Sequence, residues 1–151
     1  LTELLRLCNE RGIHTAVDTA GCVPWTSFEQ LLPYTDLFLY DLKCCDERIH
    51  RRYTGVSNEL ILDNLGRLAQ IDPDRILVRI PVIPGVNTTD EEMHGMAALL
   101  KARSIRHAEL LPYHRMGEHK YEDLGREAVR FPVPTDSEMA RCRAFFSEIS
   151  G

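Results

Sequence analysis

Apolar residues along this chain recur at helical spacing in some segments and gather in short strand-like runs in others. Residues 1–11 and 59–70 carry apolar side chains on one helical face, whereas 36–42 and 75–83 are dense in β-branched, leucine and aromatic residues. The same criteria predict strands at 13–17, 36–42, 75–83 and 107–111. They predict helices at 1–11, 26–32, 46–53, 59–70, 88–103 and 136–149, with a long polar connection at 115–133.

Capping residues and prolines indicate where these elements begin and end. The helix at 59–70 is expected to take its N-terminal cap from Ser57 or Asn58, and the helix at 88–103 from Thr88 or Thr89. Pro81 is expected to loosen the hydrogen-bond ladder in the second half of its strand, because proline has no amide hydrogen. Helices that alternate with strands favour right-handed βαβ units and a parallel sheet. The sequence therefore predicts an α/β fold, and both an open sheet and a piece of a βα barrel fit this order.

Length and composition indicate one globular domain over residues 1–151. The chain has 18 Lys and Arg against 23 Asp and Glu, a net charge of −5, which gives no basic surface for nucleic acid or an anionic membrane. No apolar run approaches the ~20 residues of a membrane span, and no secretory leader is visible. Because the chain opens at Leu1 inside a helical pattern, we expect it to be cut from a longer protein. Its five cysteines have no C-x-x-C spacing and are expected to be reduced thiols of a cytoplasmic protein.

Ionisable residues stand at or near the end of each predicted strand. Asp18 follows the first strand, Asp41 and Lys43 end the second, Arg79 lies within the third, and His114 follows the fourth. Sites in parallel α/β folds form at the carboxyl ends of strands, so these five side chains are expected to converge on one rim. Polar residues also end strands simply because turns are polar, which explains any one of them equally well.

Three chemistries are compatible with this set of residues. Asp18, Asp41 and His114 could hold a metal ion for hydrolysis. Lys43 could form a Schiff base with a carbonyl substrate. Alternatively, Lys43, Arg79 and His114 could bind an anionic cofactor that carries a carboxylate. Composition and spacing do not choose among the three.

Five stretches of the chain resemble the radical S-adenosylmethionine enzymes that activate glycyl radical enzymes, among them the pyruvate formate-lyase-activating enzymes. They occur in the family's order and span almost the whole chain. The stretches are GIHTAVDTAG at 12–21, DLFLYDLK at 36–43, TGVSNELILDNL at 54–65, VRIPVIPGVN at 78–87 and ELLPYHRMGEHKYEDLG at 109–125.

The resemblance implies a partial (β/α)6 barrel of radical S-adenosylmethionine type. This chain would supply its last four parallel β/α units and a C-terminal helix, the C-terminal two-thirds of the barrel. The family's C-x-x-x-C-x-x-C loop, which binds a 4Fe–4S cluster, and its Gly-Gly-Glu segment are both missing from this sequence. The cluster ligands are therefore expected in a full-length parent, and the isolated chain is expected to contain no catalytic residue and to be inactive.

The resemblance also implies a role for each strand-end residue. Asp18, Asp41, Lys43, Arg79 and His114 would bind S-adenosylmethionine. Lys43 would pair with the methionine carboxylate, His114 would face the ribose and adenine, and Asp18 and Asp41 would also hold a monovalent cation. His119 and Lys120 are expected to be surface residues, with contact to a partner protein as the alternative.

The implied parent reductively cleaves S-adenosylmethionine to a 5′-deoxyadenosyl radical, which generates a glycyl radical on a partner such as pyruvate formate-lyase. An electron donor such as flavodoxin or ferredoxin would serve it in an anaerobic cytoplasm. Activation of another glycyl radical enzyme is the first alternative, and a metal-dependent or Schiff-base barrel enzyme is the second. Cys44 and Cys45, which directly follow Lys43, are expected to be free thiols rather than cluster ligands.

Overall fold

A computed structural model describes residues 1–116, 123, 125 and 130–149 of the chain. Its centre is one parallel sheet of four strands in the order β1-β2-β3-β4. The strands are β1 (Ala16–Thr19), β2 (Leu37–Asp41), β3 (Ile76–Val82) and β4 (His107–Pro112). The α/β class and the sequential parallel order predicted from the sequence are confirmed.

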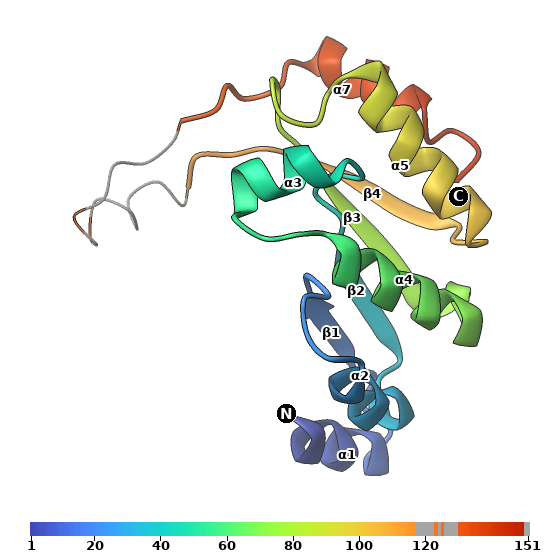
Figure 1. The fold of residues 1–151 in the computed structure, drawn as a ribbon. Helices are drawn as coiled ribbons and strands as arrows, with labels where there is room; N and C mark the ends of the chain where they lie inside the picture. Colours follow the sequence, from blue (N-terminus) through green and yellow to red (C-terminus); the bar gives the residue numbers. More distant parts are fainter. Residues whose placement is uncertain (117–122, 124, 126–129, 150–151) are drawn as a thin grey trace.

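Helices precede, separate and follow the strands along the chain and cover one face of the sheet (Figure 1). They are α1 (Thr2–Glu10), α2 (Trp25–Leu31), α3 (Glu47–Thr54), α4 (Glu59–Ile71), α5 (Asp90–Ala102) and α7 (Asp136–Ala144). Short 3₁₀ turns at Leu32–Tyr34 and Pro73–Arg75 lead into β2 and β3. No helix among the described residues is long and apolar enough to cross a membrane.

The core lies between this covered face of the sheet and helices α4 and α5. In β3 every second residue is buried, so Val78 and Ile80 pack inward while Arg79 stands on the opposite, half-buried face. Leu65 of α4 and Met96 of α5 are fully buried members of the same apolar cluster. The uncovered face of the sheet is therefore the one on which charged residues can gather.

Helix caps follow the sequence in most places. Asp46 accepts hydrogen bonds from the amides of Arg48 and Ile49 at the start of α3, and Thr89 caps α5 through the amide of Glu92. At the start of α4, the side chain of Ser57 accepts a hydrogen bond from the amide of Glu59 at 3.2 Å. Asn58, the alternative cap, occupies the N-cap position, but its side chain makes no cap hydrogen bond, because the amide turns into the core instead.

Two predicted limits and one predicted effect of a proline were wrong. β1 starts at Ala16 rather than at residue 13, because Thr15 is held by Asp36 and the carbonyl of Tyr34 just before the strand. Pro81 does not loosen the ladder, since β3 and β4 stay paired through Val82 and Pro112. Helix α7 ends at Ala144, five residues before the predicted limit, and turns follow it.

Candidate functional site

Four of the five predicted site residues come from neighbouring strands of the uncovered face. Asp18 lies inside β1, Asp41 is the last residue of β2, Lys43 follows it by two positions, and Arg79 lies in β3. Asp41 and Arg79 are register partners across β2 and β3. Because residues two apart on a strand point to the same side, Asp41 and Lys43 share the face on which Arg79 stands.

The carboxylate of Asp41 is the centre of a hydrogen-bonded network. Its Oδ2 accepts from Nζ of Lys43 at 3.2 Å, and its Oδ1 accepts from Nη2 and Nε of Arg79 at 2.8 and 3.1 Å. Nη2 of Arg79 also donates to Oδ1 of Asp18 at 2.5 Å. We call these four residues the strand-end cluster. It joins three strands and balances two cations against two carboxylates.

Burial differs across the strand-end cluster. The side chains of Arg79 and Asp41 are 20% and 26% exposed, whereas those of Lys43 and Asp18 are 38% and 62% exposed. Partial burial by itself would lower the pKa of Arg79, but its hydrogen bonds to Asp41 and Asp18 outweigh that effect and raise it. Arg79 is therefore the more buried cation of the strand-end cluster, held by both carboxylates, and Lys43 is the cation that solvent and ligands can reach.

Lys43 is the reactive group of the Schiff-base alternative, and its Nζ lies 3.2 Å from Oδ2 of Asp41. A half-exposed lysine ammonium is suited to binding a carboxylate. The arrangement also places a cation between Asp18 and Asp41, where the resemblance implies a monovalent ion, since Nη2 of Arg79 bonds both carboxylates.

His114 does not join this network among the described residues. It lies two positions beyond β4 and is exposed. Sequence reasoning overlooked Glu109 of β4, which is the register partner of Arg79 and therefore lies on the same face of the sheet. The alternation of polar and apolar residues in β4 could have identified it. His119 and Lys120 lie outside the described residues.

The loop after β1 is fixed by close packing. Gly21 has a φ of 72°, and a Cβ atom on it would lie 1.7 Å from the hydroxyl oxygen of Tyr40. That hydroxyl donates to the carbonyl of Ile61 at 2.6 Å, so Tyr40 itself is held in place. The buried side chain of Asn64 donates to the carbonyls of Gly21 and Val23, both at 2.8 Å.

The cysteines do not form a cluster site. Burial, and then the nearby Glu92, raises the pKa of both Cys44 and Cys45 to about 12, so their thiols stay protonated at neutral pH. Within the described ranges no group of three His, Cys, Asp or Glu residues stands close enough to hold a metal ion. All five cysteines are free in the structure.

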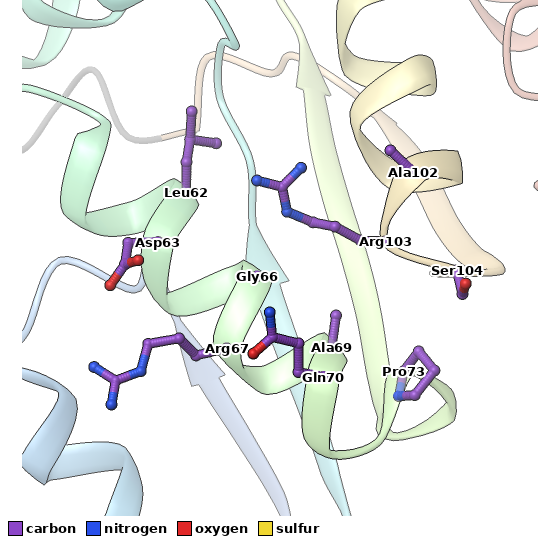
Figure 2. A pocket seen from close by; sticks show the side chains of 10 residues that line it. All are labelled: Leu62, Asp63, Gly66, Arg67, Ala69, Gln70, Pro73, Ala102, Arg103 and Ser104. Carbon is purple, nitrogen blue, oxygen red and sulfur yellow. The ribbon is translucent and has the colours of Figure 1, made fainter.

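A hollow of about 600 Å³ lies elsewhere, between α4 and the C-terminal end of α5 (Figure 2). Arg67 and Gln70 of α4 and Arg103 just after α5 line it. Arg67 already stacks over Trp25, with its guanidinium carbon 4.1 Å from the ring centre. No residue of the strand-end cluster lines this hollow, so the cluster remains the candidate site.

Comparison with solved structures identifies the class of this parallel sheet as a radical S-adenosylmethionine domain. A domain of the pyruvate-formate lyase-activating enzyme from Bacteroides vulgatus superposes with a TM-score of 0.80 at 30% identity, covering 99% of this chain and 84% of that one. No protein-family model matches the chain.

Two curated relatives are similar at the level of sequence. The isethionate sulfite-lyase activating enzyme of Nitratidesulfovibrio vulgaris is 42% identical over 139 residues, which cover 91% of this chain and 45% of that enzyme. The trans-4-hydroxy-L-proline dehydratase activating enzyme of Clostridioides difficile is 37% identical over 147 residues, covering 95% and 48%. The chain belongs to the glycyl-radical-enzyme activating family, and it spans about half the length of these two relatives.

Proposed function

We propose that this chain is the C-terminal part of a glycyl-radical-enzyme activating enzyme and that its strand-end cluster binds S-adenosylmethionine. The observation that carries this proposal is the shared carboxylate of Asp41, which holds the Lys43 ammonium at the solvent-accessible end of the sheet. In the whole enzyme, S-adenosylmethionine bound beside a reduced 4Fe–4S cluster would supply the radical that takes a hydrogen atom from a glycine of the partner.

Each residue of the cluster has a distinct part in this proposal. Lys43 pairs with the methionine carboxylate of the ligand, because it is the most exposed cation of the network. Asp18 and Asp41 face the ligand's ammonium and, through the carboxylate oxygens that Arg79 does not bond, a monovalent cation. Arg79 keeps the two carboxylates together and aligned. His114 reaches the ribose and adenine side, at the end of β4.

The iron–sulfur cluster does not fit the residues described here. Cys44 is buried, and its thiol is held in the protonated form, whereas cluster ligands are thiolates. We therefore assign the cluster ligands to a part of the whole protein outside this sequence, and we derive no step from the cluster.

The partner of the whole enzyme is a glycyl radical enzyme in this proposal. Pyruvate formate-lyase is one candidate, and the similarity to the isethionate and hydroxyproline activating enzymes supports two others. An electron donor of the flavodoxin or ferredoxin type and an anaerobic cytoplasm complete the proposal.

Ligand binding by this chain tests the central claim. S-adenosylmethionine is titrated into the wild-type chain and into Lys43→Ala by calorimetry. A charge-assisted pair contributes ~1.5–3 kcal/mol, so losing it should raise the dissociation constant about tenfold to a hundredfold. Decarboxylated S-adenosylmethionine, which lacks the carboxylate, should bind both proteins equally.

Lys101→Ala is the matched control for this experiment. Lys101 forms an ion pair with Glu148 at 2.6 Å, and both side chains are more than 70% exposed, on helix α5 and near the C-terminus. Its loss should leave S-adenosylmethionine binding unchanged. Equal dissociation constants for the wild-type chain and Lys43→Ala would remove Lys43 from the site and contradict the proposal.

A further inference from the structure

Residues Lys43 to Asp46, between β2 and α3, belong to no helix or strand, yet buried polar side chains hold each of them. Asn58, Asn87 and Glu92 are 2%, 0% and 3% exposed. They come from three separate places: the start of α4, the turn after β3, and the first turn of α5. Burying polar groups costs free energy unless they are hydrogen-bonded, so the partners of these three side chains are informative.

Asn87 uses every hydrogen-bonding group of its side chain. Its Nδ2 donates to the carbonyl oxygens of Lys43 and Pro81 at 2.8 and 2.7 Å, and its Oδ1 accepts from the amide of Ile83 at 2.9 Å. Two donors and one acceptor in a short planar group are what only an asparagine offers at this size. Aspartate has the same shape but cannot donate, and leucine can do neither.

These bonds connect the end of β2 to the end of β3. Lys43 lies beyond the last residue of β2, so its carbonyl has no place in the ladder of the sheet. Asn87 ties that carbonyl to Pro81, two residues from Arg79 on the same strand. Lys43 and Arg79 both bond Asp41, so the backbone tie fixes the base from which the Lys43 ammonium reaches the carboxylate.

The neighbouring residues are held independently. Nδ2 of Asn58 donates to the carbonyls of Cys44 and Cys45 at 3.2 and 2.9 Å. The carboxylate of Glu92 accepts from the amides of Cys45 and Asp46. Asn87 is therefore the buried side chain that bonds Lys43 itself, while Asn58 and Glu92 hold the next three residues of the chain.

We propose that Asn87 is a positioning residue for Lys43, tying the Lys43 carbonyl to the end of β3 and so holding its ammonium where a ligand's carboxylate binds. The inference rests on the proposed function only for the identity of that ligand. If the backbone at Lys43 were not held, the flexible lysine side chain could still pair with a ligand's carboxylate. Binding would then be weaker, because it would also have to order the backbone.

A double-mutant cycle separates this role from a general loss of stability. S-adenosylmethionine binding is measured by calorimetry for the wild-type chain, Asn87→Ala, Lys43→Ala and the double variant. If Asn87 acts through Lys43, Asn87→Ala weakens binding by up to the factor that Lys43→Ala causes, and adds nothing once Lys43 is gone. Losses that multiply in the double variant would overturn the proposal.

Asn64→Ala is the matched control. Asn64 is also fully buried and also donates two hydrogen bonds, but to the carbonyls of Gly21 and Val23 after β1. The factors by which Asn64→Ala and Lys43→Ala raise the dissociation constant should multiply in the double variant. This result defines the behaviour of a buried asparagine that is not coupled to Lys43.

Hydrogen–deuterium exchange decides the matter without any ligand, so it stands even if the chain binds no S-adenosylmethionine and the proposed function fails. Asn87→Ala should speed exchange in residues 42–44, ahead of the amides that Glu92 holds, and Asn64→Ala should speed it in 20–24 only. Unchanged exchange in 42–44 would overturn the proposal. Should Asn87→Ala fail to fold, Asn87→Asp keeps the bond from Ile83 and removes only the two donated bonds.

Discussion

Replacing Arg79 with methionine should destabilise the protein more than the loss of an exposed ion pair. The guanidinium makes three hydrogen bonds to two carboxylates and is itself 20% exposed. Methionine retains most of the apolar length of the side chain but none of the charge. The variant would leave Asp18 and Asp41 facing each other without the cation that both now bond.

The expected size follows from the burial of each partner. Asp18 is 62% exposed, so its pair with Arg79 contributes only ~0–1 kcal/mol. Asp41 is 26% exposed, and a charge-assisted bond at such a site contributes ~1.5–3 kcal/mol. Together they give about 1.5–4 kcal/mol, which corresponds to a fall in Tm of roughly 3–16 °C for a domain of this size.

Thermal unfolding followed by circular dichroism measures this effect, with Arg106→Met as the control. Arg106 pairs with Asp74 at 2.6 Å, but the two side chains are 71% and 54% exposed, so its loss should change Tm little. Potassium chloride should restore part of the stability of Arg79→Met, since a small cation can sit between Asp18 and Asp41, and tetramethylammonium chloride should not. Equal losses in the two variants would refute the reasoning about Arg79.

Two other features give predictions of their own. Burial raises the pKa of Cys44 to about 12 from 9.0, so the unfolded chain loses that proton first and stability should fall as pH rises from 9 towards 12. Urea unfolding of the wild-type chain should show a steeper alkaline decline than that of Cys44→Ala, and parallel curves would contradict the assignment. Gly21→Ala should lower the free energy of unfolding by about 2–5 kcal/mol, because the new methyl group meets Tyr40 at a φ of 72°. A variant as stable as the wild-type chain in the same urea titration would show that the loop after β1 relaxes freely.

Much of the sheet could be predicted because each strand is a short apolar run between polar turns. The parallel order then follows from the helices that separate the strands. The part of the site that could be predicted is the part set by local spacing: Asp41 and Lys43 share a face because they are two positions apart. That Arg79 bonds Asp18 as well as Asp41 could not be predicted, because it depends on strand register and on how far a guanidinium reaches across β2.

Asn58 shows most clearly why the buried hydrogen bonds near the site could not be predicted from the sequence. An asparagine just before a helix is typical of a cap, and the local pattern therefore predicted one. In the fold its amide instead bonds the carbonyls of Cys44 and Cys45, residues 14 and 13 positions away. The local hydrogen bond of a cap competes with distant acceptors, and only the packing of α4 against the end of β2 decides between them.

The buried amides follow from a requirement of parallel sheets. Where a strand ends, the carbonyls of the next residues leave the ladder while still covered by the helices, and they need donors from elsewhere. Asn64 meets that need after β1 and Asn87 after β2, each with two hydrogens on one nitrogen. Asn64 lies in α4, which follows β2, and Asn87 lies in the turn that follows β3. Each asparagine therefore comes from the connection after the next strand, which passes the end of the strand before it. An asparagine at such a place in a βα sequence is therefore a candidate for holding the preceding loop, and with it whatever charged residue that loop presents to a ligand.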